Sequence, residues 1–318
     1  HIRLRTENLE DASLVQAGIR PGVGGAVKII ELIARRRGKP FAYEHPELEN
    51  ILGHTYGIVV FQEQIDMLLQ TFCRYGAGEA EEIREQIHKR RREDYGQVIR
   101  EEMITRMIHN GFERKVAEHV FELVAGFKGY GFAQGHALAF AEISIRSIYC
   151  QQNFPAHYFA SLLSAQPAGY YSPATLANEA RNRGILMLPL DVNCSEELFT
   201  VEDVKATRDP KIILPSGGIR IGWMQVSGLS GGTRKRIVAQ RDRPYESFID
   251  FVRRVRPSRD ELEQLVLAGA FDRLQPHRRA LLWAIPQALA EAQPGEKLDV
   301  TPEVDETNLT DFNPVEKA

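Results

Sequence analysis

The sequence has no long apolar run and little cysteine. No stretch comes near the roughly 18 consecutive apolar residues that a membrane-spanning helix needs, and no basic-then-apolar segment typical of a secretory leader is visible. The three cysteines, Cys73, Cys150 and Cys194, lie far apart, which argues against a disulfide framework or a zinc ribbon and fits a reducing compartment. The composition therefore predicts a cytoplasmic protein that does not contact a membrane.

Motifs for metal-assisted or nucleotide chemistry are also missing. The chain contains no Asp-x-Asp pair, no Gly-x-x-x-x-Gly-Lys-Ser/Thr phosphate loop and no Cys/His set with zinc spacing. Two-metal phosphoryl transfer needs carboxylates that hold the ions about 4 Å apart. The one close group of acids, Glu303, Asp305 and Glu306, lies in a polar tail that we expect to be a linker. The sequence thus predicts no metal site and no catalytic residue of its own.

What the sequence does contain is typical of a soluble globular protein of two or three domains. It has 318 residues, of which 43% are hydrophobic and 26% charged, with a net charge of −3. Residues 234–259 hold nine Lys or Arg and three acids, whereas residues 291–318 hold eight acids and two lysines. This asymmetry fits a polyanion-binding surface next to an acidic linker. It fits a solvated helical face about equally well.

Hydrophobic periodicity predicts a mainly α-helical protein with a small β-sheet, an α+β fold. Residues 45–164 predict six to eight packed helices, and one apolar face of this region consists of Ile65, Leu68, Leu69 and Phe72. The next part is rich in β-formers and turn residues, and it predicts short strands within residues 185–192, 198–201, 211–214 and 218–221. Residues 231–290 are again helical, and Ser258 and Glu261 have the spacing of a capping box.

A basic cluster near position 90 is the first candidate binding site. Arg84 lies one turn before Lys89, Arg90 and Arg91, and such groups pair with phosphate oxygens through charge-assisted hydrogen bonds. The cluster would suit a triphosphate or a DNA backbone. Acids nearly balance bases between residues 81 and 115, so an exposed helix end with ion pairs is the alternative.

A glycine- and aromatic-rich segment, residues 129–141, is the second candidate site. It predicts a turn, followed by a helix of small residues that begins near His136. A helix N-terminus offers unpaired N–H groups and a positive dipole end to a phosphate, so this helix start is a candidate phosphate site to which His136 would add a donor. A histidine at a helix start also serves as a cap or as a packed residue, and the pattern leaves that alternative open.

The third candidate site resembles a helix-hairpin-helix element. Residues 226–232 contain Gly228 and Gly231, and the basic residues Arg234, Lys235 and Arg236 follow. In that motif a glycine turn presents backbone N–H groups to a DNA phosphate without reading the base sequence. Residues 265–272 predict a second hairpin of a tandem pair, although Ser230 stands where the first copy usually has glycine. An ordinary αα-hairpin is the alternative.

Several segments in this order resemble the bacterial C-family DNA polymerases, the family of the DNA polymerase III alpha subunit. The resemblance covers about residues 5–290 and rests on residues 19–22, 45–52, 55–64, 78–91, 129–141, 188–193 and 268–272. It implies the end of the palm in residues 1–44, the fingers in 45–215, a tandem helix-hairpin-helix domain in 216–290 and an acidic linker in 291–318. It also implies that the catalytic aspartates precede His1 and that the clamp-binding segment follows Ala318, so that the chain alone is inactive.

The resemblance implies roles for the candidate residues. Deoxynucleoside triphosphate (dNTP) would be bound by Arg84, Lys89, Arg90 and Arg91, with Gln134 and His136 lining its pocket. Primer–template DNA would contact Arg20, Gly228, Gly231, Arg234, Lys235 and Arg236. In the full-length enzyme, Mg²⁺ would be held by palm residues upstream, and partners would include the sliding clamp and other replication or repair proteins.

Residues 165–173 are more similar to the error-prone, translesion branch of the family than to the replicative one. Residues 133–136 lack a lysine that the replicative form often has, and Glu85 stands where the family usually has arginine. These departures favour the error-prone branch. Two other functions stay open. The first is a non-catalytic DNA-binding or scaffold module that keeps the polymerase-like fold. The second is a helix-hairpin-helix DNA glycosylase that uses Asp250, which resembles an ordinary acid on a helix surface.

Overall fold

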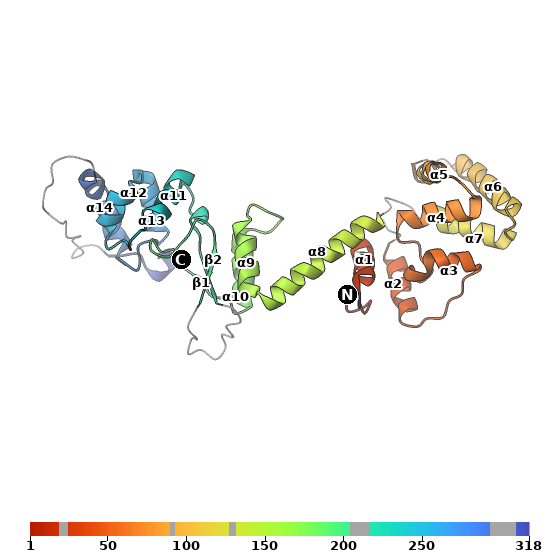
Figure 1. Cartoon of the computed structure of the whole chain (residues 1–318), viewed down its shortest axis with the longest axis horizontal. Helices are drawn as coiled ribbons and strands as arrows, with labels where there is room; N and C mark the ends of the chain where they lie inside the picture. Colours follow the sequence, from red (N-terminus) through yellow and green to blue (C-terminus); the bar gives the residue numbers. More distant parts are fainter. Residues whose placement is uncertain (19–24, 90–92, 127–131, 204–216, 293–309, 318) are drawn as a thin grey trace. The chain divides into compact units, whose positions relative to one another are not determined.

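The computed structural model describes residues 1–18, 25–89, 93–126, 132–203, 217–292 and 310–317 (Figure 1). The described chain is mainly helical with one three-stranded sheet, which confirms the predicted fold class. It forms two compact units, His1–Ser147 and Ile148–Ala318. The unit boundary lies inside the predicted fingers segment, and the predicted boundaries at residues 44, 215 and 290 stay predictions. None of the described helices is long and apolar enough to cross a membrane.

Several helices of the first unit pack against α4 (Gln62–Cys73). Leu68 and Phe72 of α4 are fully buried, and burying such a side chain stabilises the fold by about 1.5–3 kcal/mol. Ile65 and Leu69 are buried beside them, so the predicted apolar face is confirmed. The helices of this unit are α1 Leu9–Gly18, α2 Gly25–Arg36, α3 Pro46–Leu52, the 3₁₀ helix η1 Gly53–Thr55, α4 Gln62–Cys73, α5 Ala77–Lys89, α6 Glu93–His109, α7 Arg114–Ala125 and the first part of α8 Gln134–Asn153.

Local polar contacts fix where α3 and α4 begin. His45 accepts a hydrogen bond from the backbone N–H of Glu47, and Pro46 occupies the first helical position, where no N–H is needed. At the start of α4, the buried Gln64 amide oxygen accepts the N–H groups of Val60 and Phe61. These backbone groups would otherwise be buried without partners. The first turn of α4 is therefore fixed in position.

A small mixed sheet lies in the second unit. Its strands are β1 Met187–Leu188, β2 Thr200–Glu202 and β3 Gly218–Arg220. The central strand β3 pairs in parallel with β1 and antiparallel with β2. Helix α9 Pro155–Ser164 packs on β2 and β3, and α10 Pro173–Asn182 packs on α9. Three of the predicted strands are therefore confirmed in shortened form, and the predicted strand at 211–214 lies outside the described residues.

The rest of the second unit is a helical domain with an aromatic core. Tyr245, Phe251 and Phe271 are buried, and their rings meet edge to face with centroids 5.0 and 4.9 Å apart. Ser258 and Glu261 form the predicted capping box. The elements are the 3₁₀ helix η2 Trp223–Gln225, α11 Gly231–Ala239, α12 Phe248–Val255, α13 Arg259–Leu267, α14 Arg278–Glu291 and the short α15 Pro314–Lys317.

Part of the predicted acidic linker contacts α14. The Asp311 carboxylate accepts a hydrogen bond from the backbone N–H of Arg279 and forms an ion pair with Lys317. The ring of Phe312 lies under the Arg279 guanidinium, with its centroid 4.5 Å from Cζ. Residues 310–317 therefore pack against the start of α14.

Candidate nucleic-acid interface

The first glycine turn leads from η2 into α11. Gly228 has φ +77°, a backbone conformation that L side chains rarely adopt, so the turn requires glycine there. Leu229 is buried and anchors the turn. The Ser230 hydroxyl oxygen then accepts the N–H of Thr233 at 3.2 Å and caps α11. The N–H groups of Gly231 and Gly232 lie in the first turn of α11, where the helix offers them no acceptor.

Two arginines lie over these glycines. A Cβ atom placed on Gly231 would be 3.6 Å from Nη2 of Arg234, and one on Gly232 would be 3.5 Å from Nη1 of Arg236. Each guanidinium therefore lies beside a glycine of the first turn of α11, where the backbone N–H groups have no acceptor within the helix. Lys235 is exposed between the arginines in sequence. We name Gly228, Gly231, Gly232, Arg234, Lys235 and Arg236 the α11 hairpin surface.

Unpaired positive charge is concentrated at this surface. Of the nine basic residues in the 234–259 block, five form ion pairs: Arg241 with Glu196, Arg243 with Glu246 and Asp250, Arg253 with Glu291, Arg254 with Asp242 and Asp250, and Arg259 with Glu263. The other four, Arg234, Lys235, Arg236 and Arg256, form no ion pair with any residue that the structure describes. The sequence could predict the excess of charge but not which charges are neutralised.

A buried carboxylate lies directly behind the α11 hairpin surface. Glu261, only 8% exposed, accepts the N–H of Ser230 at 3.1 Å, the hydroxyl of Thr233 at 2.9 Å and the N–H of Ser258 at 3.0 Å. Burial opposes its ionisation, but these hydrogen bonds outweigh burial and lower its pKa to about 2. The capping-box pattern predicted the bond to Ser258. The bond to Ser230, 31 residues earlier, has no local sequence signal.

The second glycine turn has the same backbone φ at its glycine as the first turn, but different side chains surround it. Gly269 also has φ +77°. A Cβ atom on it would come within 2.2 Å of Nη2 of Arg278, so that guanidinium already covers the turn. Asp272 holds the guanidinium through two hydrogen bonds. The predicted tandem turn is therefore present, but the ion pair of Arg278 with Asp272 covers it.

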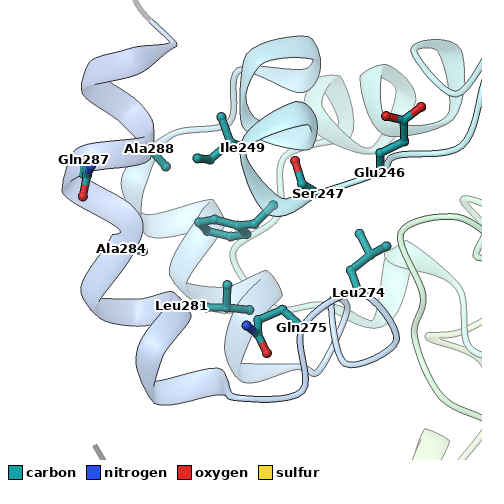
Figure 2. Close-up of a pocket in the computed structure, with 10 residues that line it drawn as sticks. Glu246, Ser247, Ile249, Leu274, Gln275, Leu281, Ala284, Gln287 and Ala288 are labelled. Atoms are coloured by element: carbon teal, nitrogen blue, oxygen red, sulfur yellow. The ribbon is translucent and has the colours of Figure 1, made fainter. Parts of the chain in front are cut away.

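The pocket between α12 and α14 does not fit an anion. Figure 2 shows its lining, which includes Ile249, Leu281, Ala284 and Ala288 around a cavity of about 210 Å³. Glu246 is its one charged lining residue, and the lining has no Lys or Arg. The phosphate-binding candidate in this unit is the α11 hairpin surface, not this pocket.

In the first unit, Arg84 is part of an internal ion pair. Its Nε donates to Asp66 of α4 at 2.8 Å, its Nη2 lies 3.6 Å from Glu81, and its side chain is 14% exposed. Burial raises the pKa of Asp66, and Arg84 opposes that shift. Lys89 is the last residue of α5. Arg20, Arg90 and Arg91 lie outside the described residues. The predicted roles of these five residues stay predictions.

The start of α8 is already occupied by a carboxylate. The backbone N–H of Gln134 donates to both carboxylate oxygens of Glu63, at 2.9 and 3.0 Å. The exposed His136 ring packs against Phe132 and Phe140, with centroids 5.2 and 4.4 Å away. The helix begins close to the predicted position, but its first N–H is not open to a phosphate. The predicted roles of Gln134 and His136 in a nucleotide pocket remain untested.

Two candidates of the first unit, Arg84 and Gln134, contact acidic residues on the same face of α4. Glu63 contacts Gln134, and Asp66, three residues later on the same helical face, contacts Arg84. The sequence predicted neither Glu63 nor Asp66 as site residues, because their partners lie 71 and 18 residues away. The hairpin candidates lie in the other compact unit.

Comparison with known protein families agrees with these features. The model of the bacterial DNA polymerase III alpha subunit finger domain matches residues 1–111, and the helix-hairpin-helix motif model matches residues 184–281. The chain belongs to the bacterial C family of DNA polymerases. Within this C-family chain, the finger match begins at residue 1 and the hairpin match at residue 184.

Similar C-family proteins carry the name error-prone DNA polymerase. That of Symbiobacterium thermophilum is 39% identical over 90% of this chain, and that of Teredinibacter turnerae is 32% identical over 98%. Error-prone DNA polymerase 1 of Rhizobium meliloti is 34% identical over 93% of the chain. The chain spans 28%, 30% and 28% of the length of these three relatives.

Proposed function

We propose that the chain is the fingers and DNA-holding part of a template-directed DNA polymerase of the error-prone type. The α11 hairpin surface would bind the phosphate backbone of primer–template duplex. The observation that carries this proposal is that the Gly231 and Gly232 N–H groups, in the first turn of α11, lie beside Arg234 and Arg236, which form no ion pair within the described part of the chain. Helix N-termini and guanidinium groups both favour phosphate, and such contacts position a duplex without reading its sequence.

The first unit would contribute to binding the incoming dNTP. Arg84 and Lys89 belong to α5, Arg90 and Arg91 follow them in the sequence, and Gln134 and His136 belong to the first turn of α8. The four basic residues would supply positive charge to the triphosphate. The carboxylates Asp66 and Glu63, which contact Arg84 and Gln134, would have to release them or share them with the triphosphate. Arg20 would contact the template–primer.

The complete reaction would need groups that this chain does not supply. We propose that Mg²⁺ is held by carboxylates in another part of the full-length protein, where two ions would assist the attack of the primer 3′-oxygen on the dNTP. The sliding clamp and other replication or repair proteins are proposed partners of that protein. The 318 residues would bind and orient the substrates and would not catalyse synthesis alone.

Duplex binding as a function of salt tests the proposal. We would compare the chain with the triple variant R234A/K235A/R236A by fluorescence anisotropy on a primer–template duplex. The matched control, R243A/R253A/R259A, also removes three positive charges, but from ion-paired residues. The proposal predicts that the first variant loses about 2.7 from the slope of log K against log salt, about 0.9 for each lost phosphate contact. Equal effects of the two variants would contradict a localised site.

A further inference from the structure

The α11 hairpin surface has an internal support that begins at a buried acid. We propose that Glu261 is a positioning residue: through the Thr233 hydroxyl it fixes the Arg236 guanidinium over Gly232, in place to contact a phosphate. This inference rests on the proposed DNA-binding function of the surface and names a group that acts on it without touching DNA.

The hydrogen bonds of Arg236 leave one nitrogen for a ligand. Its Nε donates to the carbonyl oxygen of Val255 at 3.0 Å, and its Nη2 donates to Oγ1 of Thr233 at 2.7 Å. Nη1 is the nitrogen near Gly232, and it donates to no residue that the structure describes. A guanidinium held at two of its nitrogens is already oriented, so a phosphate that binds Nη1 does not have to immobilise the side chain.

The carboxylate determines the direction of this chain of hydrogen bonds. An ionised carboxylate only accepts and a guanidinium only donates. The Thr233 hydroxyl, between Glu261 at 2.9 Å and Arg236 at 2.7 Å, therefore gives its proton to Glu261 and turns a lone pair to Arg236. The other Glu261 oxygen accepts the N–H of Ser230, the residue that caps α11. One carboxylate thus fixes both the cap and the arginine.

Charge alone and positioning predict opposite results for the variant Glu261→Gln. The Glu261 charge lies behind a surface proposed to bind phosphate, so its removal on electrostatic grounds strengthens DNA binding. A glutamine side chain has one acceptor oxygen in place of two, and it cannot accept from Ser230, Ser258 and Thr233 as the carboxylate does. The positioning role therefore predicts that E261Q weakens duplex binding by about three- to tenfold, the loss that corresponds to the net contribution of one ordinary hydrogen bond.

The experiment is a double-mutant cycle between Glu261 and Arg236 in the whole chain, read as affinity for a primer–template duplex. We expect E261Q to weaken binding in the native background but not in the R236A background, because the weakening acts through Arg236 and only the favourable loss of the Glu261 charge remains without it. Thr233→Val should behave like E261Q, and Thr233→Ser, which keeps the hydroxyl, should bind like the native chain. Ser258→Ala is the matched control, since it weakens the α13 cap without removing a bond to Ser230 or Thr233.

The outcomes separate this inference from the proposed function. If R236A weakens binding but E261Q strengthens it, leaves it unchanged, or weakens it equally in both backgrounds, the positioning role is wrong and the DNA site stands. If R236A itself leaves duplex affinity unchanged, the assigned DNA contact of Arg236 is wrong and the inference is overturned with it. Far-ultraviolet circular dichroism measures whether each variant is folded. If E261Q does not fold, T233V provides the same test of the positioning role.

Discussion

Arg278 lies across the second glycine turn and is held there by Asp272. Its Nε and Nη2 donate to the two carboxylate oxygens of Asp272 at 2.9 and 2.7 Å, and its Nη1 donates to the carbonyl oxygen of Leu267 at 2.9 Å. At the first turn, a Cβ atom on Gly228 would meet Gln264 at 3.7 Å and no guanidinium that the structure describes, although Gly228 and Gly269 share the same φ of +77°. The two turns therefore share a backbone conformation but differ in their surroundings. The ion pair at the second turn stabilises the domain, whereas the first turn is the one that we propose for ligand binding.

The variant Asp272→Ala tests the structural role of the second turn. It leaves the Arg278 guanidinium, 10% exposed, without its carboxylate. We expect the free energy of unfolding to fall by about 1.5–3 kcal/mol, the range for hydrogen bonds to charged groups. Urea denaturation measures that change. Duplex affinity should stay within about twofold of native, and a large loss of affinity would show that the second turn also contacts DNA.

The two variants that replace a turn glycine with alanine, G228A and G269A, should lose different amounts of stability. A residue with a Cβ atom in the left-handed region costs about 1–2 kcal/mol, so both G228A and G269A should lower the free energy of unfolding. The Gly269 variant should be the more destabilised. Its Cβ atom would lie 2.2 Å from a nitrogen of Arg278, whereas the Cβ atom of the Gly228 variant would meet only Gln264, at 3.7 Å. Equal losses in urea titrations would argue against the close cover of the second turn.

The free energy of unfolding should depend on pH through the ionisation of Glu261. The hydrogen bonds to Ser230, Ser258 and Thr233 lower its pKa from 4.5 to about 2. A carboxyl group with a lowered pKa in the folded state stabilises that state above its unfolded pKa, and the contribution is lost as pH falls through the folded value. After allowance for solvent screening, we expect the ionised Glu261 to contribute about 1–2 kcal/mol to the free energy of unfolding. The difference in free energy of unfolding between the native chain and E261Q should be constant near pH 7 and shrink between pH 4.5 and 2. If the difference in unfolding free energy stayed constant down to pH 2, the lowered pKa of Glu261 would be contradicted.

Local rules account for the parts of the fold that the sequence predicted. The capping box of Ser258 and Glu261 and the buried face of α4 each depend on residues within one or two turns. The helical fold class with a small sheet follows from the same periodicities. These features are set by the sequence around them, and the structure confirms them.

Long-range partners account for what the sequence could not predict. Glu63 occupies the start of α8 across 71 residues, and Glu261 supports the α11 cap across 31. Arg241 is neutralised by Glu196, 45 residues before it. Side chains so distant in sequence have no fixed spacing, so composition predicted a basic block but not the four residues in it that stay unpaired.

The account's central claim is that DNA phosphate approaches the backbone of Gly231 and Gly232. The most direct measurement is the duplex affinity of G231A/G232A, which changes no charge. The added Cβ atoms meet nothing closer than 3.5 Å, and alanine favours a helix over glycine by up to about 1 kcal/mol per residue. The account predicts that stability in urea is kept or raised while duplex affinity falls about tenfold or more, since the methyl groups point toward the helix N-terminus where the phosphate would lie. Native affinity in a stably folded G231A/G232A chain would contradict the claim.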